Sequence, residues 1–432
     1  MLKTGISHNQ IVHDKTAMQR SLLNSSFIFT TALFAGALIK TAGADWPQWR
    51  GPDRTDVSTE TRLLKQWPAG GPKQRWLYRN AGKGYSGPAI VRGRLFTIGT
   101  RDGNEAIIVL DANTGAEVWT AKVGPILNNA WGDGPRGTPT VSGDRVYALG
   151  GQGNLVCAAT TDGKIIWQAS MKDLGGTTPD WGYTESVLVD GDRVVCTPGG
   201  GKGALAALDK STGKLLWQSA EFTDPAQYAS IVIGNNNGIR QYVQLTMHNV
   251  VGISATDGKL LWKSPWPGQT AVIPTPIVRN GQVYVTSGYG VGCKLIKLGQ
   301  GDQASDVYQN KVMKNHHGGV VLVGDQLYGY SDGAGWVCQN FQTGAEVWSD
   351  KKSLGKGAIT VADGMMYCLA EEDGTVVLAD ASPAGWREHG RFKLSPQTTI
   401  RSSQGHIWTH PVISNGKLYL RDQDLIYCYD VK

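Results

Sequence analysis

Histidine and carboxylate side chains that could hold a metal gather in a few short segments of this 432-residue chain. Four of its eight histidines lie in only two of these segments, residues 315–319 and 406–410. Imidazole and carboxylate groups at convergent positions suit zinc, or a harder cation if carbonyl oxygens contribute. One hypothesis is therefore a divalent metal bound by His316, His317, His410 and Glu185. Adjacent residues on a strand point to opposite faces, so we expect only one of the two neighbouring histidines to face such a site.

Cationic and aromatic side chains in similar segments predict an alternative site. A guanidinium or ammonium group pairs with an anion, and an indole ring offers a flat surface for stacking. An anionic or sugar-like ligand or cofactor would then be bound by Arg136 and Lys356, with Trp181 as the stacking surface and Tyr183 beside it. A purely structural role is also open, in which these groups bond one another and ordered water and tie their segments together.

A repeated turn explains how segments so far apart in the sequence would meet. At eight places a residue pair that contains Gly, usually with Asn or Asp, precedes a short β-branched or aromatic run. These residue types tolerate the positive φ of tight hairpins, so each pair is expected to join the first and second strands of a repeat. The pairs are Arg92-Gly93, Gly143-Asp144, Gly191-Asp192, Asn237-Gly238, Asn280-Gly281, Gly324-Asp325, Asp363-Gly364 and Asn415-Gly416.

A second signature places a Gly four residues before a Trp, and we expect it at the turn between the third and fourth strands. It occurs at Gly115 and Trp119, Gly163 and Trp167, Gly213 and Trp217, Gly258 and Trp262, and Gly344 and Trp348. In two further repeats Tyr308, and either Trp386 or Phe392, are expected to replace the Trp. The unit of about 40 to 50 residues with four short strands has the size of a β-propeller blade. We expect each aromatic ring to lie across the gap to the neighbouring blade.

The two ends of the chain predict how a ring of blades closes. The last repeat supplies strands after Trp408, around residues 418–420 and around residues 426–428, but no fourth strand follows. Residues 73–78 resemble a fourth strand that lacks its preceding three. Pairing these two ends removes the open sheet edges that invite aggregation. Residues 72–432 are therefore predicted to be an all-β, eight-bladed β-propeller of four-stranded antiparallel blades.

The residue patterns place the candidate site at one mouth of the propeller channel. In a propeller the innermost strand of each blade lines the channel, and the segment that enters this strand lies at the channel mouth. The candidate binding residues stand just ahead of the first strands of their repeats. Binding residues are commonly carried by such loops on a rigid scaffold. We therefore expect a ligand or a protein partner to bind at the channel mouth.

Two stretches of the chain resemble a known group of propellers. Asp111-Ala112-Asn113-Thr114-Gly115-Ala116-Glu117-Val118-Trp119 and its copies resemble the repeat of pyrroloquinoline-quinone (PQQ) dehydrogenases and of their non-enzymatic relatives. Asp45-Trp46-Pro47-Gln48-Trp49-Arg50-Gly51-Pro52 resembles the start of exported bacterial PQQ-like repeat proteins. The likeness covers essentially the whole chain after residue 44. It implies the propeller fold, whereas for function it allows alcohol and sugar dehydrogenases as well as scaffolds of outer-membrane assembly.

The dehydrogenase alternative needs a planar quinone, a calcium ion and a carboxylate base. The resemblance would place Trp181 under the quinone, Glu185 on the calcium, Asp133 as the base and Arg136 on a quinone carboxylate. No two cysteines are adjacent and no haem-attachment motif occurs, unlike in many alcohol dehydrogenases of this type. We therefore expect a binding or scaffold propeller. A PQQ-dependent dehydrogenase of an alcohol or sugar is the alternative, and metal-dependent hydrolysis or lyase chemistry is a further one.

The N-terminus has the order of residues found in a signal peptide. Arg20 precedes an apolar run at residues 27–39, and small residues follow up to Ala44. The run is too short to span a membrane as a helix. We expect cleavage after Ala44, which makes residues 1–44 a signal peptide with an N-terminal extension and the mature protein periplasmic or secreted. Residues 45–71 contain three Trp and are expected to pack on the propeller.

Charge and cysteine content exclude other classes of protein. Without residues 1–44 the chain keeps 38 basic and 35 acidic residues, too even a balance to suggest nucleic-acid binding. The six cysteines fall in different repeats and show neither a CxxC pair nor a zinc spacing. We expect most of them to be small buried side chains in strands, with one disulfide between blades as the alternative. We also expect a monomer without a transmembrane segment in the mature chain.

Overall fold

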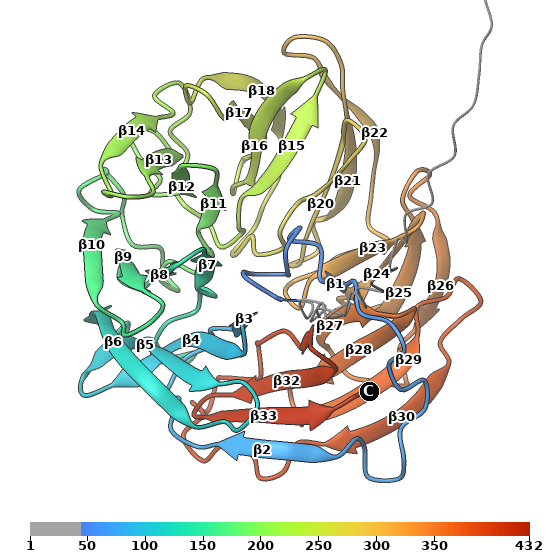
Figure 1. The fold of residues 1–432 in the computed structure, drawn as a ribbon. Helices are drawn as coiled ribbons and strands as arrows, with labels where there is room; N and C mark the ends of the chain where they lie inside the picture. The colour runs from blue at the N-terminus through green and yellow to red at the C-terminus, as the bar shows by residue number, and fades with distance from the viewer. Residues whose placement is uncertain (1–44) are drawn as a thin grey trace, which may run out of the picture. The chain divides into compact units, whose positions relative to one another are not determined.

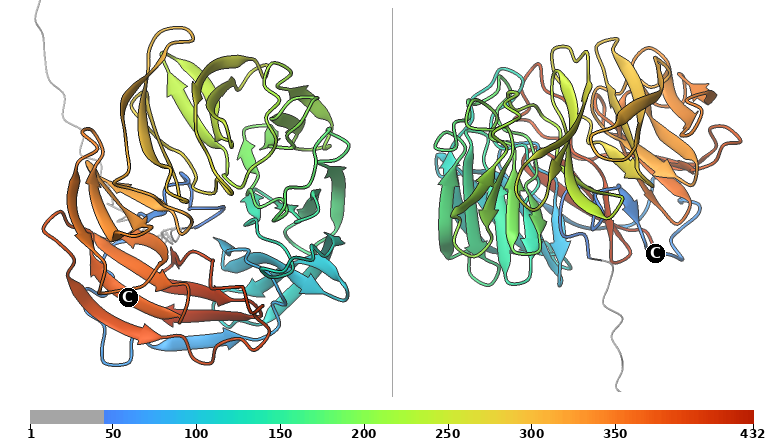
Figure 2. Two further views of the ribbon diagram at one scale, coloured as in Figure 1. Left: turned by 180° about the vertical axis from the view of Figure 1, so that it is seen from behind. Right: turned by 90° about the horizontal axis from the view of Figure 1, so that it is seen from above.

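The computed structural model describes residues 45–432, and the predicted signal peptide lies outside them. Within this range every regular element is a β-strand. The strands form eight separate sheets that are arranged in a ring (Figure 1). Views from behind and from above show the sheets side by side around the same ring (Figure 2). The prediction of an all-β, eight-bladed propeller is confirmed.

Blades 1 to 4 follow one another along the chain, and each is an antiparallel meander of four strands. The first strand of each blade lies nearest the channel and the fourth lies outermost (Figure 1). Blade 1 has β3 (Ala89–Val91), β4 (Arg94–Arg101), β5 (Asn104–Asp111) and β6 (Glu117–Pro125), and blade 2 has β7 (Thr140–Ser142), β8 (Arg145–Leu149), β9 (Asn154–Ala159) and β10 (Ile165–Ser170). Blade 3 has β11 (Leu188–Asp190), β12 (Arg193–Cys196), β13 (Ala206–Asp209) and β14 (Leu215–Gln218), and blade 4 has β15 (Val232–Asn236), β16 (Ile239–Leu245), β17 (Asn249–Ser254) and β18 (Leu260–Pro265).

Blades 5 to 8 continue the ring, and the last two of them also use strands from the N-terminal part of the chain. Blade 5 has β19 (Ile277–Arg279), β20 (Gln282–Ser287), β21 (Gly292–Leu298) and β22 (Ala304–Asn310), and blade 6 has β23 (Val320–Val323), β24 (Gln326–Ser331), β25 (Gly335–Asn340) and β26 (Glu346–Asp350). Blade 7 has β27 (Gly357–Ala362), β28 (Met365–Ala370), β29 (Thr375–Asp380) and β30 (Glu388–Lys393), with β1 (Val57–Ser58) parallel to β27. Blade 8 has β31 (Val412–Ser414), β32 (Lys417–Asp422), β33 (Leu425–Asp430) and, as its outer strand, β2 (Gln74–Tyr78).

All eight predicted hairpin turns join the first and second strands of a blade, so this prediction is confirmed. In five of them both central residues have positive φ, as at Asn237 (51°) and Gly238 (80°). In the other three the leading Gly alone has positive φ, as at Gly324 (57°). Asn, Asp and Gly reach this region at low cost, which explains their recurrence at these positions.

A side chain of the preceding strand holds the turn before several outer strands. In blade 1, Asp111 Oδ1 accepts hydrogen bonds from the main-chain N–H groups of Asn113 and Thr114, both at 2.9 Å. Gly115 follows with a φ of 74°. Asp209 and Asn340 make the same pair of contacts in blades 3 and 6. These local bonds end the strand and leave a glycine at the outer end of the turn.

An aromatic ring on the outer strand of one blade covers this glycine in the next blade. A Cβ atom added at Gly163 would lie 2.6 Å from the ring of Trp119, so only glycine leaves room for the ring. Trp119 Nε1 also donates to the carbonyl oxygen of Thr160 at 3.1 Å. The same contact joins Trp76 to Gly115, Trp167 to Gly213, Trp217 to Gly258 and Tyr308 to Gly344. We call this place on the outer strand the rim position; its predicted role is confirmed for these five rings, including Tyr308. Trp262 differs, because its Nε1 donates to Gln241 Oε1 within its own blade at 2.5 Å.

Blade 7 lacks a side chain at the rim position. In blade 6 the position belongs to a row of paired residues, in which Tyr328 is opposite Cys338 and Cys338 is opposite Trp348. In blade 7 the corresponding row is Tyr367, Leu378 and Gly390. The missing aromatic ring must therefore come from elsewhere in the chain.

Trp67, which precedes the propeller strands, supplies the missing ring of blade 7. A Cβ atom added at Gly390 would lie 2.6 Å from Trp67 Cβ, and the Trp67 ring centroid is 5.9 Å from that of Tyr367. The prediction that Trp386 or Phe392 replaces the tryptophan was therefore wrong. Phe392 lies farther along the outer strand, and Trp386 lies in the turn before it. The residue at the rim position is set by the register between strands, and the spacing of residues in the sequence does not give that register.

The first propeller strand of the chain closes the ring. β2 pairs antiparallel with β33, and Trp76 is opposite Cys428. Trp76 Nε1 donates to the carbonyl oxygen of Ala112 in blade 1 at 3.2 Å. This strand therefore completes blade 8 and also contacts blade 1, so the predicted closure is confirmed. It removes an open sheet edge.

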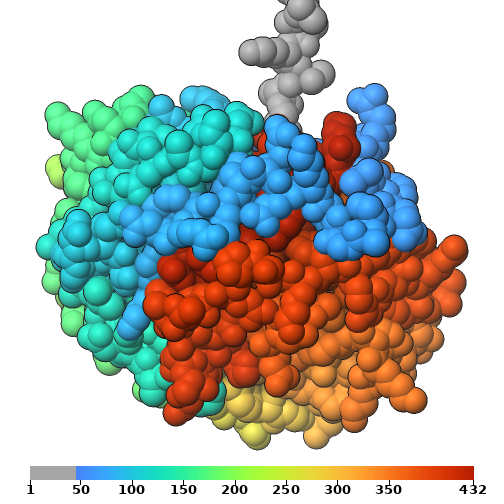
Figure 3. Space-filling model, turned by 90° about the horizontal axis from the view of Figure 1, so that it is seen from below, coloured from blue at the N-terminus to red at the C-terminus, as the bar shows by residue number. Residues whose placement is uncertain are grey.

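Residues 45–71, called the N-terminal segment below, cross several blades. Their first part lies near the middle of the ring in Figure 1, and blue and red atoms of the two ends of the described chain adjoin in Figure 3. Trp46 pairs through its backbone with the first strand of blade 1. Arg54 is 4% exposed and lies among carbonyl groups of the segments that enter blades 3 and 4. It donates to the carbonyl oxygens of Ser186, Val187 and Ile231 at 3.0, 2.6 and 2.8 Å.

The six cysteines are all buried and free, and all lie in strands. The expectation that they are small buried side chains is confirmed, and the alternative of a disulfide between blades is not. In the part of the chain that the structure describes, no helix has the length and apolar character needed to cross a bilayer.

Candidate functional site

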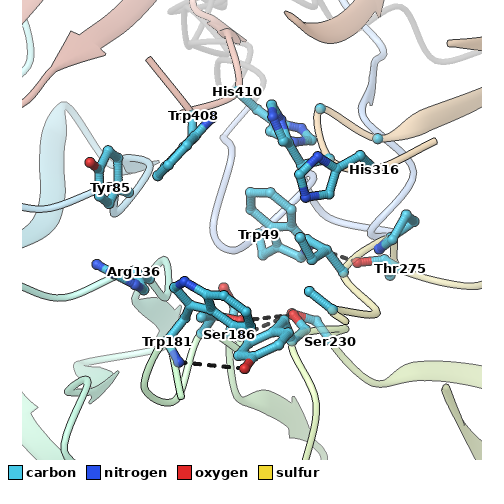
Figure 4. Close-up of a pocket in the computed structure, with 18 of the residues that line it drawn as sticks. Trp49, Tyr85, Arg136, Trp181, Ser186, Ser230, Thr275, His316, Trp408 and His410 are labelled. Carbon is cyan, nitrogen blue, oxygen red and sulfur yellow. Dashed lines mark hydrogen bonds between the residues drawn. The ribbon is translucent and has the colours of Figure 1, made fainter. Parts of the chain in front are cut away.

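The segments that enter the innermost strands surround a cavity of about 380 Å³, which we call the mouth cavity. Seven of the eight blades and the N-terminal segment contribute to its lining, and Figure 4 labels ten of these residues. The full lining is Trp49, Arg50, Tyr85, Trp131, Arg136, Trp181, Thr184, Ser186, Tyr228, Ser230, Ala271, Ile273, Pro274, Thr275, Tyr289, His316, His317, Gly318, Gly319, Trp408 and His410. The expected convergence of distant segments is confirmed.

The N-terminal segment contributes Trp49 to the lining. Its indole Nε1 donates to Thr275 Oγ1 at 3.0 Å, and its ring centroid is 4.4 Å from that of His410. The hydrogen bond and the ring contact fix the indole plane within the cavity (Figure 4). The segment that precedes the propeller is therefore part of the candidate site.

A buried ion-pair network supports His410. The carboxylate of Asp56 lies 2.7 Å from Arg50 Nε, as an ion pair, and 3.1 Å from His410 Nδ1, and all three side chains are buried. Arg50 also donates to the carbonyl oxygen of Val320 at 2.6 Å. The charge of Arg50 is thus compensated within the network. Because Nδ1 is engaged, Nε2 is the ring nitrogen of His410 that is left for other partners.

Aromatic rings form two groups on the cavity walls. Tyr85 and Trp131 lie beside Trp408, with ring centroids 4.9 and 6.5 Å from it. Trp181 lies edge-on to Tyr228 at 5.7 Å. In Figure 4 Arg136 is seen between Tyr85 and Trp181. A flat apolar group in the cavity would therefore meet aromatic surfaces from more than one side.

Arg136 brings a cation into this aromatic surrounding. Its guanidinium lies 5.1 Å from the ring centroid of Tyr85 and donates to the carbonyl oxygens of Gly132 and Gly134, at 2.9 and 3.1 Å. Burial lowers the pKa of Arg136, although the charges of Glu105 and Asp133 oppose this. Among residues 45–432 no carboxylate lies within ion-pair distance of the group. The guanidinium therefore keeps N–H donors for a ligand.

His316 is held as a neutral imidazole. Lys356 Nζ lies 2.8 Å from its Nδ1, and Tyr289 Oη lies 2.8 Å from its Nε2. An ammonium group can only donate, so Nδ1 accepts and the ring proton is on Nε2. Burial lowers the pKa of His316 to about 3, and the nearby His317 and Lys356 act in the same direction. Lys356 is itself paired with Asp332 at 2.9 Å.

His317 forms a buried pair with Glu371 through Nε2, whereas its Nδ1 is buried without a hydrogen-bond partner. Burial alone would raise the pKa of Glu371. The hydrogen bond from His317 and the charges of His317, Lys356 and His406 outweigh burial and hold this pKa below its ordinary value. The carboxylate is therefore ionised and compensates positive charge beside the cavity.

Five of the predicted site residues line the mouth cavity: Arg136, Trp181, His316, His317 and His410. The expectation that only one of the two adjacent histidines faces the site was wrong. Residues 315–319 form no strand, and Gly318 and Gly319 have φ of 86° and 79°. Strand alternation therefore does not govern where these two rings point.

Tyr183 and Glu185 lie outside the cavity lining. Tyr183 is 1% exposed, and its hydroxyl donates to the carbonyl oxygen of Pro198 at 3.0 Å. Glu185 is 2% exposed, and its Oε1 accepts the main-chain N–H of Thr197 at 2.7 Å. Burial raises the pKa of Glu185 to about 7, although Thr197 and the charge of Arg54 lower it in part. Both side chains hold the blade together rather than reach a ligand.

Asp133 and Lys356 also lie outside the lining. Asp133 belongs to a separate hollow, where it is paired with Lys83 at 2.8 Å. Burial would raise its pKa, but bonds from Lys83 and Asn129 bring the pKa below its ordinary value. Such a carboxylate is a poor proton acceptor for substrate in the mouth cavity. Lys356 acts behind His316, as described above.

The side chains do not fit the predicted metal or the calcium of a quinone site. In the described residues no group of three or more His, Cys, Asp or Glu side chains is arranged to hold a metal ion. The lining of the mouth cavity includes no Asp, Glu, Asn or Gln. Calcium is bound mainly by carboxylate and carbonyl oxygens, so PQQ with calcium finds no matching ligand set here.

Sequence reasoning missed several lining residues, among them Trp49, Tyr289 and Thr275. Trp49 and Arg50 lie in a stretch quoted only for its resemblance, and no repeat signature marks their position. Thr184 and Ser186 line the cavity, whereas Tyr183 and Glu185 do not. The period-two alternation of an extended segment would have separated these two pairs.

Comparison with known proteins gives the family context. The sequence profile of the family described as outer membrane protein assembly factor BamB matches residues 103–349 and 300–425. The factor BamB of Shewanella oneidensis is 26% identical over 223 residues, which cover 48% of this chain and 53% of that protein. The factor BamB of Burkholderia pseudomallei is 25% identical over 232 residues, with coverages of 49% and 55%. These matches span about half the length of each relative.

Solved structures share the fold at low sequence identity. BamB from Moraxella catarrhalis superposes with a TM-score of 0.58 at 15% identity, over 83% of this chain and 97% of that one. The quinohemoprotein alcohol dehydrogenase from Comamonas testosteroni gives 0.59 at 10% identity, over 90% and 80%. Because BamB and an alcohol dehydrogenase superpose almost equally well, the likeness to these structures shows the fold alone.

Proposed function

Because this chain belongs to the family of the outer membrane protein assembly factor BamB, we propose that it is an exported, non-catalytic propeller that serves outer-membrane protein assembly as a binding scaffold. In this proposal the mouth cavity receives a small ligand or a segment of a protein partner. Export places the chain in the periplasm or beyond. The observation that carries the proposal is the lining: aromatic rings and one guanidinium that has no carboxylate at ion-pair distance among the described residues, with no carboxylate in the lining itself.

The state of the histidines supports binding rather than acid–base catalysis. Both ring nitrogens of His316 are engaged, and His317 and His410 each have one nitrogen on a carboxylate. A general base needs a free lone pair within reach of the substrate proton and a pKa near the working pH. His316, with a pKa lowered to about 3, does not meet this need.

Site-specific photocrosslinking in cells tests the proposal. Tyr289 lines the cavity and is 40% exposed, so it can be replaced by an aromatic photocrosslinking residue. Leu215, which is 49% exposed on outer strand β14, provides the matched control position. We expect adducts from position 289 with a protein of the outer-membrane assembly machinery. Adducts from position 215 alone would show that the mouth is not the partner site.

A reconstitution assay tests the dehydrogenase alternative. Mature protein that starts at Asp45 is mixed with PQQ and calcium, and dye reduction is followed with a panel of alcohols and aldoses. We expect neither a change in quinone absorbance nor turnover, because the cavity has no acidic or amide side chains for calcium. Saturable quinone binding with turnover would replace the scaffold proposal by an enzyme.

A further inference from the structure

One cation of the mouth cavity has no carboxylate at ion-pair distance among the described residues. Arg50 and His410 share the carboxylate of Asp56, at 2.7 and 3.1 Å. His317 is paired with Glu371. Arg136 is the lining residue of fixed charge for which no carboxylate among residues 45–432 comes within ion-pair distance. Glu105 and Asp133 act on its charge only from a longer distance, so the guanidinium can form a direct pair with one anionic group of a ligand.

Arg136 is oriented to receive that charge. The carbonyl oxygens of Gly132 and Gly134 hold two of its N–H groups, and the ring of Tyr85 faces the guanidinium at 5.1 Å. A guanidinium has five N–H donors, so three remain without a partner among the described residues. A carboxylate accepts two parallel hydrogen bonds from such a group, which gives affinity and fixes the ligand's orientation.

The walls select the body of the ligand. Trp131, Trp181 and Trp408 offer indole faces or edges, and the lining contains no Asp, Glu, Asn or Gln that would bind sugar hydroxyls. A phosphate dianion would favour a second cation beside Arg136, and Arg50, the other lining arginine among residues 45–432, is already paired with Asp56. The volume of about 380 Å³ is near the lower end of ordinary ligand pockets, enough for one aromatic ring with a short chain.

We infer that the mouth cavity binds an aromatic monocarboxylate, whose carboxylate pairs with Arg136 and whose ring lies among Trp131, Trp181 and Trp408. Two sources present this chemistry: a free aromatic acid, and an aromatic residue at the carboxyl end of a polypeptide. The inference rests on the proposed function only in taking the mouth cavity as the binding site. It concerns ligand chemistry and can be tested on the purified mature chain.

Isothermal titration calorimetry with paired probes tests the inference. The first pair is 3-phenylpropionate and its neutral amide; the second is the peptide Gly-Gly-Phe with a free or an amidated carboxyl end. We expect each acid to bind at least about tenfold more tightly than its amide, since only the acid offers Arg136 a charged acceptor for two parallel hydrogen bonds. Binding of 3-phenylpropionate alone would identify a free aromatic acid as the ligand. Binding of both acids would show that the cavity also accepts the carboxyl end of a polypeptide.

Three variants make the result specific. Arg136→Gln should weaken the acid at least about tenfold and leave the amide unchanged, whereas Arg79→Gln, at an exposed arginine outside the cavity, should change neither. Trp131→Ala, at a side chain that is 41% exposed, should keep the fold and weaken the binding of both acid and amide.

Equal affinities for acid and amide, unchanged binding in Arg136→Gln, or no saturable binding at millimolar concentration would overturn the inference. Failure of crosslinking at Tyr289 with intact acid binding would instead reject the mouth as the partner site and leave the ligand inference standing.

Discussion

Trp67 covers the backbone of Gly390, so that blade 7 receives its rim ring from a residue outside the blade. The ring meets Tyr367, as the rim tryptophan of blade 6 meets Tyr328. The N-terminal segment is thus built into the same packing system as the repeats. Removing its ring should act like removing a rim tryptophan.

Trp67→Ala is expected to destabilise the propeller by about 3–5 kcal/mol, because it empties a site in which the indole is 3% exposed. Chemical denaturation followed by circular dichroism measures the change. Trp131→Ala is the size-matched control at an exposed position and should stay within about 0.5 kcal/mol. Similar losses in both variants would mean that Trp67 has no special packing role.

Deletion through Tyr78 removes β2 and should open the ring. β33 would then present an unpaired edge, and Gly115 would lose the ring of Trp76. We expect aggregation, measured by light scattering and size-exclusion chromatography. Deletion through Ala44 keeps β2 and should leave the melting temperature unchanged. A monomeric, cooperatively melting protein after the longer deletion would contradict the closure.

The stability of the protein should depend on the protonation of Glu185. Burial raises its folded pKa to about 7, whereas the unfolded value is near 4.5. Between these values the folded state holds a proton that the unfolded state has lost. This contribution to stability is complete below about pH 4.5 and is lost as the pH rises towards 7, by up to about 1.4 kcal/mol per pH unit.

Glu185→Gln tests this dependence, because the amide keeps an oxygen for the N–H of Thr197 but cannot titrate. Unfolding free energies of both proteins are measured from pH 4 to 8. We expect the unfolding free energy of the variant to rise relative to that of the native protein as the pH rises through this window. Parallel profiles would show that Glu185 has an ordinary pKa in the folded state.

His316 should stay neutral far into the acid range. Burial, with the charges of His317 and Lys356, lowers its pKa to about 3. The unfolded chain binds a proton near pH 6.5 and the folded one does not, so this contribution to stability is present above 6.5 and is lost as the pH falls towards 3. NMR titration of the imidazole measures the pKa directly. Lys356→Met should raise the pKa of His316, and an unchanged value would contradict the contact.

The rim could be predicted from the sequence because its rules are local. Glycine at positive φ, a side-chain bond such as that of Asp111 and a tryptophan four residues after the glycine recur at fixed spacing. Each is dictated by turn geometry and by the contact with the next blade. The rim ring of blade 7 was predicted wrongly, because Gly390 is seen to occupy the rim position only once the strand register is known.

The mouth cavity could be located from the sequence, but its composition could not. The entering segments converge as expected, and Arg136 and Trp181 line the cavity. Trp49 was missed because its place depends on long-range contacts such as the bond to Thr275. Glu185 was wrongly predicted to bind a ligand, because the sequence does not show whether a carboxylate binds a ligand or accepts a neighbouring main-chain N–H.

The pairing of β2 with β33 has a consequence for the order of folding. Trp76 and Cys428 are opposite each other, although nearly the whole propeller separates them in sequence. A contact of this separation has a high loop-closure cost and tends to form late. β2 is synthesised before the strands of blades 1 to 7 that follow it, but it can pair only after β33, the last strand, has been made. A prematurely terminated chain therefore leaves β2 without its partner.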